Sequence, residues 1–134
     1  SALQNRGVEL DRNMILDGEF RESVAYELAK KYIQEHGRDG ATAFMCLSDV
    51  MALGVMKAIN DLGYSVPEDF SVTGFDGIPI TEYTTPSLTT IEQEMYEIGY
   101  YAAETLCELA KYPQQCKNVY VPYRFVERNS VRTL

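Results

Sequence analysis

The stretch ATAFMCLSDVMALGVMKAINDLGYSVPEDFSVTGFD, residues 41–76, decides the fold class of this chain. Residues 41–47 form a short, continuous apolar run, which is typical of a strand buried on both faces of a sheet. Ser48 or Asp49 can cap a helix. The apolar residues that follow recur at helical spacing: Ala52, Val55, Met56, Ile59 and Leu62. Residues 71–75 form a second apolar strand, so the order of elements predicts a parallel sheet with a right-handed crossover.

The same alternation of elements continues on both sides of this stretch. Apolar residues at helical spacing predict helices at residues 19–36 and 94–111, and residues 88–91 predict a third strand. Residues 118–130 predict an extended segment that Pro122 interrupts. Together these elements predict an α/β fold, a three-layer sandwich built on a parallel sheet.

The composition argues against several classes of function. A net charge of −8 over 134 residues disfavours binding to a nucleic-acid backbone, which requires clustered lysine and arginine. No apolar run approaches the roughly 18 residues of a membrane span, and the first residues lack the apolar core of a secretory signal. Cys46, Cys107 and Cys116 have no paired spacing, and His36 is the single histidine. We therefore expect a cytoplasmic protein with no disulfide framework, metal or cofactor.

Polar side chains stand where the predicted strands end. Ser48 and Asp49 follow the first strand, Asp76 follows the second, and Glu92 and Gln93 follow the third. In parallel sheets, ligands bind beyond the carboxyl ends of the strands. The convergence of these residues at one edge predicts a ligand site there.

The two aspartates allow an enzymatic interpretation. Asp49 and Asp76 could hold Mg²⁺ or accept a phosphoryl group, but the sequence has no glycine-rich phosphate loop and no nucleophile beside a base. A helix cap is therefore the preferred interpretation of Asp49. Asp76 opens a loop, where its carboxylate either accepts hydrogen bonds from ligand hydroxyls or structures the loop.

Phe20 and Gln93 each allow two interpretations. Phe20 follows a glycine-bearing turn and opens the first helix, where an aromatic residue is usually part of the core. The alternative is a platform for the apolar face of a sugar ring or a planar base. Gln93 offers a donor and an acceptor to a ligand hydroxyl, or is simply a polar residue at the entry of a helix.

Five motifs follow one another along the chain: S-D-x-M-A-x-G (48–54), G-x-x-V-P-x-D-x-S-V-x-G-F-D (63–76), P-x-L-T-T-I-x-Q (86–93), G-x-x-A (99–102) and E-R-N-S-V (127–131). A D-G-E-F turn at 17–20 precedes them. In this order the motifs closely resemble the lactose/galactose-repressor (LacI/GalR) family of bacterial transcription regulators. The resemblance covers nearly the whole chain.

The resemblance implies a fold and a division of the chain. The family's sensor has the two-lobed fold of the type I periplasmic binding proteins, and this chain is expected to be an incomplete lobe of it. Residues 1–90 plus 124–134 would form the C-terminal lobe, and residues 91–123 a crossover segment of the N-terminal lobe. The rest of that lobe and the DNA-binding head are expected to lie outside this sequence.

The resemblance also implies a function. Sensors of this family bind a small sugar-like effector between the lobes, form homodimers and control DNA binding allosterically. We therefore expect an effector-binding domain that is not an enzyme, has no membrane contact and reaches operator DNA only through the absent head. The alternative is a periplasmic sugar-binding protein of a transporter, and a metal-dependent phosphoryl-transfer enzyme is less favoured.

The family's site residues map onto this sequence by motif. Phe20 takes the place of the aromatic residue that stacks on the ligand ring, Asp76 that of the carboxylate that binds ligand hydroxyls, and Gln93 that of the crossover glutamine. Ser48 stands where many members have asparagine, and its shorter hydroxyl reaches less far toward a ligand. By the same resemblance, Leu53 and Tyr83 are expected at the dimer interface.

Overall fold

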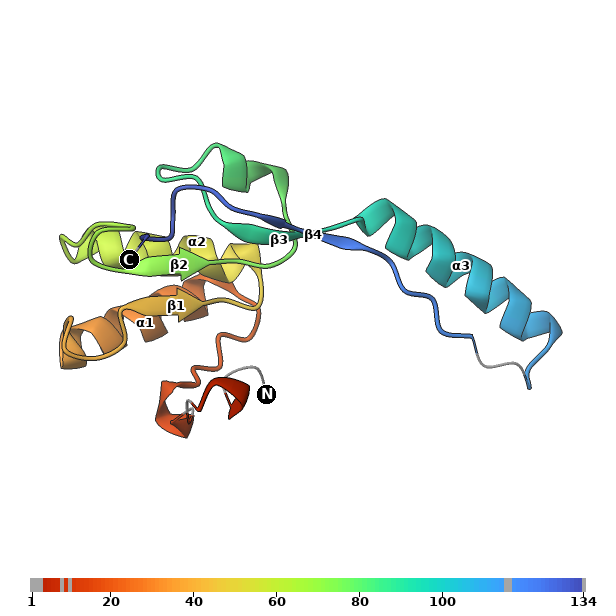
Figure 1. The fold of residues 1–134 in the computed structure, drawn as a ribbon, viewed down its shortest axis with the longest axis horizontal. Helices are drawn as coiled ribbons and strands as arrows, with labels where there is room; N and C mark the ends of the chain where they lie inside the picture. The colour runs from red at the N-terminus through yellow and green to blue at the C-terminus, as the bar shows by residue number, and fades with distance from the viewer. Residues whose placement is uncertain (1–3, 8, 10, 115–116, 134) are drawn as a thin grey trace.

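Two helices, α1 (Glu22–His36) and α2 (Asp49–Asp61), pack side by side behind strands β1 (Ala43–Met45) and β2 (Ser71–Thr73) in the computed structural model (Figure 1). The structure describes residues 4–7, 9, 11–114 and 117–133. The buried hydrophobic core comes from α1, α2, β2 and the segments that flank β2 and β3: Ala25, Ala29, Ile33, Met51, Ala52, Val55, Met56, Ala58, Ile59, Phe70, Val72 and Leu88. The helical spacing found in the sequence therefore predicted the face that α2 buries.

Small residues allow the two helices to approach closely. Ala25 and Ala29 lie on the buried side of α1, and Gly54 lies on the buried side of α2. A Cβ atom at Gly54 would collide with the carbonyl oxygen of Glu22. Gly54 is therefore required by the helix–helix contact and not by any turn.

The described strands form two two-stranded sheets, β1–β2 and β3–β4, which isolated bridges join edge to edge in the order β1, β2, β3, β4. β1 and β2 are parallel, with Phe44 opposite Val72. β3 (Thr90–Gln93) continues the sheet through two parallel bridges, from Thr73 to Thr89 and from Asp76 to Glu92. β4 (Tyr123–Val126) then pairs antiparallel with β3. The predicted α/β class with a parallel sheet is confirmed, and the predicted extended segment supplies an antiparallel edge strand.

The strand predicted at residues 41–47 is buried on one face only. Phe44 and Cys46 pack against the helix layer, whereas Met45 and Leu47 are 80% and 62% exposed. The prediction of burial on both faces was wrong for the described residues, because α1 and α2 cover only the face of Phe44. Two of the three predicted layers are present, as expected for an incomplete lobe.

Ser130 joins the C-terminal residues to the sheet between β2 and the segment that leads into β3. Its backbone carbonyl accepts a 2.8 Å hydrogen bond from Val72 N, and its hydroxyl donates a 2.6 Å bond to Val72 O. The same hydroxyl accepts a 2.8 Å bond from Thr89 N. Two residues earlier, the Arg128 guanidinium donates to Thr81 Oγ1 and Leu88 O. The E-R-N-S-V motif therefore has a structural role.

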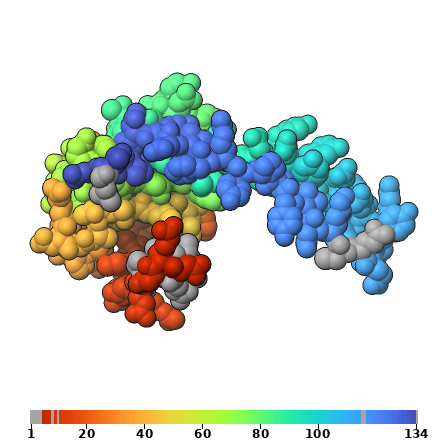
Figure 2. All heavy atoms as spheres, in the orientation of Figure 1, coloured from red at the N-terminus to blue at the C-terminus, as the bar shows by residue number. Residues whose placement is uncertain are grey.

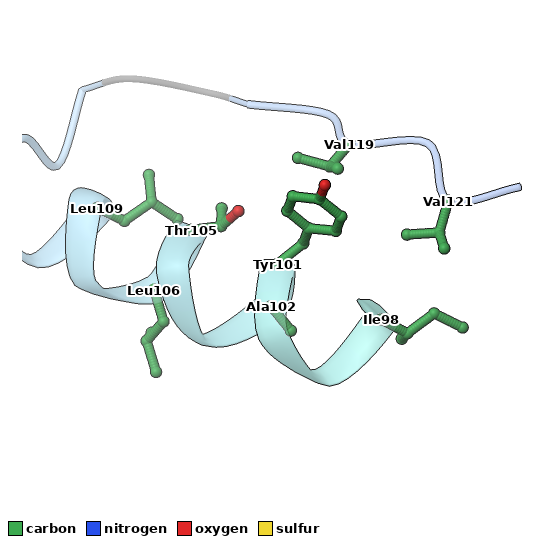
Figure 3. A pocket seen from close by; sticks show the side chains of 8 residues that line it. All are labelled: Ile98, Tyr101, Ala102, Thr105, Leu106, Leu109, Val119 and Val121. Carbon is green, nitrogen blue, oxygen red and sulfur yellow. The ribbon is translucent and has the colours of Figure 1, made fainter. Parts of the chain in front are cut away.

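Helix α3 (Met95–Lys111) projects away from this α/β unit as an arm (Figures 1 and 2). No residue of α3 is buried. Residues 117–122 return along the helix, and Lys117 forms a 2.9 Å ion pair with Glu108. The helix and the returning segment form an apolar cavity of about 530 Å³ that is open to solvent (Figure 3). Its lining residues are Ile98, Tyr101, Ala102, Thr105, Leu106, Leu109, Val119 and Val121.

Three short 3-10 helices complete the described chain: η1 (Gln4–Arg6), η2 (Arg12–Met14) and η3 (Pro79–Glu82). Among the cysteines, Cys46 is half-buried, Cys107 is exposed and Cys116 lies outside the described residues. No helix in the described part of the chain has the length and apolar content that crossing a membrane requires.

Candidate functional site

Asp76 lies just beyond the carboxyl end of β2, in a backbone conformation that is rare for a side chain of its kind. Its φ angle is +118°, and Gly77 follows with φ +76°. Hydrogen bonds to β3 hold this conformation, from Asp76 N to Ile91 O (2.9 Å) and from Gln93 N to Asp76 O (3.1 Å). Non-glycine residues at positive φ cost energy and cluster at binding and active sites.

Gln93 brings its side chain onto Asp76. Its Nε2 donates a 2.9 Å hydrogen bond to Asp76 Oδ1, and both side chains are half-buried. Gln93 also lines a cavity of about 320 Å³ at the base of the arm, together with Phe75, Ile91, Ile98, Val121, Pro122 and Tyr123. The structure therefore brings together two polar residues that stand at separate strand ends in the sequence.

Ser48 is the N-terminal cap of α2. Its Oγ accepts a 3.3 Å hydrogen bond from Met51 N, and the residue is 4% exposed. Of the two capping candidates in the sequence, Ser48 has this role. Its hydroxyl hydrogen can still donate, so the cap leaves one polar function for a ligand.

Asp49 is the residue whose role the sequence did not reveal. It is fully buried in the first turn of α2, and its Oδ2 accepts hydrogen bonds from Gly77 N (2.7 Å) and Ile78 N (2.8 Å). Its Oδ1 accepts a 2.6 Å bond from Thr90 Oγ1. The expected helix cap at Asp49 was wrong, because the carboxylate points toward the loop after β2 and not along its own helix.

The same geometry bears on the Mg²⁺ interpretation of Asp49 and Asp76. Three donors already occupy the Asp49 carboxylate, and no part of it is exposed. Within the described ranges, no group of three or more His, Cys, Asp or Glu side chains is placed to hold a metal ion. The structure also explains the glycine of G-F-D: a Cβ atom at Gly74 would collide with Asp49 Oδ1, so the glycine makes room for the carboxylate.

Phe20 lies on the surface, and the interpretation as a core residue was wrong. Its ring is 66% exposed, and both Glu19 and Phe20 have positive φ angles, +52° and +53°. The turn that holds it lies against the N-terminal turn of α2, since a Cβ atom at Gly18 would approach Met51 Sδ to 2.6 Å. Phe20 is therefore at the same end of the sheet as Ser48.

An ion pair spans the two strands that lead to the arm. Arg124 Nη2 lies 2.6 Å from Glu92 Oε2, and the two residues are directly opposite in the β3–β4 register. The predicted interface residues lie outside this site: Leu53 is half-buried on α2, and Tyr83 is 77% exposed at the end of η3.

Comparisons with known proteins decide the family. The model of the periplasmic binding protein-like domain matches residues 1–131. The chain belongs to this family. It is 38% identical to the HTH-type transcriptional repressor PurR of Vibrio atlanticus, over 99% of this chain and 40% of that protein. It is 36% identical to the HTH-type transcriptional regulator MalR of Clostridium butyricum, over 96% of this chain and 38% of that protein.

A solved structure agrees with these relatives. A LacI-family transcriptional regulator from Enterococcus faecium with bound ribose matches with a TM-score of 0.84 and 30% identity, over 99% of this chain and 49% of that one. The resemblance to LacI-type regulators seen in the motifs is confirmed, and so is the periplasmic binding protein-like fold. The chain spans about two fifths of the length of the curated relatives.

Proposed function

We propose that this chain is part of the effector-binding domain of a LacI-type transcriptional regulator and that it binds a small sugar-like molecule. The observation that carries the proposal is the hydrogen bond between Asp76 and Gln93. It places a carboxylate and a primary amide at the carboxyl ends of β2 and β3, where ligands of α/β folds bind. Together the pair offers both acceptors and donors to ligand hydroxyls.

The four predicted ligand-contact residues fit a polyol or a sugar ring. Asp76 accepts hydrogen bonds from ligand hydroxyls, each contributing about 1.5–3 kcal/mol when the acceptor is charged. The exposed ring of Phe20 offers a flat apolar surface to the ring of the ligand. Ser48 has a hydroxyl hydrogen to donate beside its capping role. The ribose bound by the Enterococcus faecium regulator supports this class of ligand.

The proposed mechanism is a population shift between open and closed sensor forms. Residues 1–90 and 124–134 belong to a C-terminal lobe, and residues 91–123 cross into an N-terminal lobe that packs on α3. Gln93, the last residue of β3, lies within this crossover segment and bonds Asp76. A ligand that contacts both lobes favours the closed form by the difference between its affinities for the two forms.

The rest of the regulator follows from the same proposal. Leu53 and Tyr83 contribute to a homodimer, and the dimer presents two DNA-binding heads to operator DNA in the cytoplasm. The negative charge of this chain fits a division in which the head alone contacts DNA. The domain performs no chemistry of its own, and its output is the altered affinity of the head for operator DNA.

The test is a thermal-shift titration of the full-length protein with ribose, lactose, maltose, adenine, guanine and hypoxanthine. At least one compound should raise the melting temperature of the wild type. Asp76→Ala should weaken binding of that compound at least about 100-fold, since two charged hydrogen bonds are lost. Asp39→Ala is the matched control, because Asp39 is exposed in the turn after α1. Full affinity in Asp76→Ala would refute the site.

A periplasmic sugar-binding protein of a transporter is the second candidate, because the family description covers such proteins too. It predicts a signal peptide upstream of Ser1, whereas the regulator predicts a helix-turn-helix there. A gel-shift assay of the full-length protein with its own promoter region separates the two. DNA binding that responds to the compound identified above supports the regulator.

A further inference from the structure

A buried carboxylate holds the loop on which Asp76 stands. Asp49 binds this loop from two directions. Its backbone N donates a 2.7 Å hydrogen bond to Phe75 O, just before Asp76. Its carboxylate accepts from the amides of Gly77 and Ile78, just after Asp76. The peptide groups on both sides of Asp76 are thus bound to one residue of α2.

These hydrogen bonds require a carboxylate or a group that accepts in the same place. The amides of Gly77 and Ile78 converge on one oxygen, Asp49 Oδ2, and Thr90 donates to the other. All three groups donate, so the side chain at position 49 must accept. None of these three donors to the Asp49 carboxylate is a cation. The negative charge is stabilised by the three donors and by the N-terminus of α2, where the helix dipole favours negative charge.

The conformation of this loop needs support from neighbouring contacts. Asp76 has φ +118°, which is unfavourable for a residue with a Cβ atom and persists only where neighbouring contacts enforce it. Gly77 also has positive φ, and a Cβ atom there would lie 2.6 Å from Glu92 Cα. Backbone bonds to β3 hold Asp76 from one side. The Asp49 carboxylate holds the following turn from the side of the helix.

We propose that Asp49 is a positioning residue for ligand binding, which fixes the direction of the Asp76 carboxylate by binding the amides of Gly77 and Ile78. The inference rests on the proposed function, because the affinity that it controls is that of the Asp76 site. On this inference, the aspartate of the S-D-x-M-A motif supports the G-F-D-G loop. The glycine of G-F-D leaves the space that the aspartate side chain needs.

Three variants of the full-length protein test the positioning role by titration calorimetry with ribose, or with whichever sugar or purine of the panel binds the wild type. Asp49→Ala should weaken binding at least 10-fold. Asp49→Asn should stay within about threefold of the wild type. Its amide oxygen can accept from Gly77 and Ile78, and its amide group can donate to Thr90 Oγ1.

Thr89→Val is the matched control for stability. Thr89 is 1% exposed and adjacent to Thr90. Its hydroxyl accepts a hydrogen bond from Arg128 N, which is not part of the loop at residues 75–78. The Thr89→Val variant should have a lower melting temperature while its affinity stays within about threefold. Equal loss of affinity in Thr89→Val and Asp49→Ala would overturn the inference, as would full affinity in Asp49→Ala. If the alanine variant does not fold, Asp49→Ser replaces it with the same expectation, because its short hydroxyl reaches neither amide.

A second measurement on the 134-residue chain needs no ligand. Amide protons that donate to a carboxylate resonate downfield, so the Gly77 and Ile78 protons should move upfield in Asp49→Asn and stay in place in Thr89→Val. Unmoved protons in Asp49→Asn would overturn the role of Asp49. If no panel compound binds the wild type, the proposed ligand class fails, and the amide shifts still decide whether Asp49 holds the loop.

Discussion

Gln93 Nε2 donates a 2.9 Å hydrogen bond to Asp76 Oδ1, which joins the last residue of β3 to the residue beyond β2. The bond couples the two side chains, since each restricts the rotamers of the other. It also lies where the chain leaves the α/β unit for the arm of α3 (Figure 1). A ligand held by both residues would therefore contact the α/β unit at the point where the arm of α3 begins.

Gln93→Leu should weaken binding of the panel compound about 10- to 100-fold in the full-length protein. The substitution keeps the size of the side chain but removes the donor to Asp76 and one hydrogen bond to a ligand hydroxyl. Gln34→Leu, at an exposed position of α1, is the control and should bind as the wild type does. Titration calorimetry measures both, and equal affinities for the two variants would contradict the role of Gln93.

Ser130→Ala should lower the free energy of unfolding by about 2–3 kcal/mol. It removes the hydroxyl that binds Val72 O and Thr89 N, which leaves two buried backbone groups without that partner. Ser87→Ala is the comparison, because Ser87 is only half-buried and accepts one exposed bond of 3.2 Å from Asn129 Nδ2. Its effect should stay under about 0.5 kcal/mol. Urea unfolding followed by circular dichroism gives both values.

The parts of the fold that follow from local pattern were predictable from the sequence. Helical spacing located the three long helices to within a few residues, and short apolar runs located β1 and β2. Because parallel strands end at one edge of a sheet, Asp76 and Gln93 were expected to lie close together, as they do. These features depend on residues near one another in sequence or on a general property of parallel sheets.

The parts that depend on distant contacts were not predictable. Asp49 looked like a helix cap, because the loop amides that it binds lie 28 and 29 residues away. The exposure of Met45 and Leu47 depends on which layers cover the sheet, and an apolar run does not contain that information. Phe20 is exposed in a turn at positive φ, and the residues D-G-E-F do not dictate that conformation.

Phe20→Gly should separate stability from binding. Glycine adopts φ +53° without the cost of a Cβ atom, and the lost ring is mostly exposed. Phe20→Gly should therefore be about 1 kcal/mol more stable than Phe20→Ala, which keeps the strained backbone. Both variants should lose the stacking surface and bind the panel compound more weakly to the same degree. Thermal unfolding and calorimetry test the pair, and wild-type affinity in both would remove Phe20 from the site.

The 134-residue chain should self-associate through α3. Met95 and Leu106 of α3 are 60% and 69% exposed, on the apolar side of a helix that has no buried residue. Light scattering at micromolar concentration should give a mass above that of a monomer. Leu106→Glu should lower this mass, whereas Tyr100→Lys, on another side of the helix, should leave it unchanged. A monomeric wild type would contradict the expectation.

Cys46 should be unreactive in the folded protein and should make stability depend on alkaline pH. Burial, with a smaller contribution from the Asp49 carboxylate, raises the pKa of the Cys46 thiol from 9.0 to about 12. The folded state therefore keeps its proton while the unfolded state loses it, so stability is full below about pH 9 and falls as pH rises toward 12. In a background with Cys107→Ser and Cys116→Ser, a thiol reagent at pH 8 should modify Cys46 only after unfolding. Cys46→Ala should flatten the loss of stability between pH 9 and 10.5, and rapid modification of the folded protein would show that the thiol is accessible.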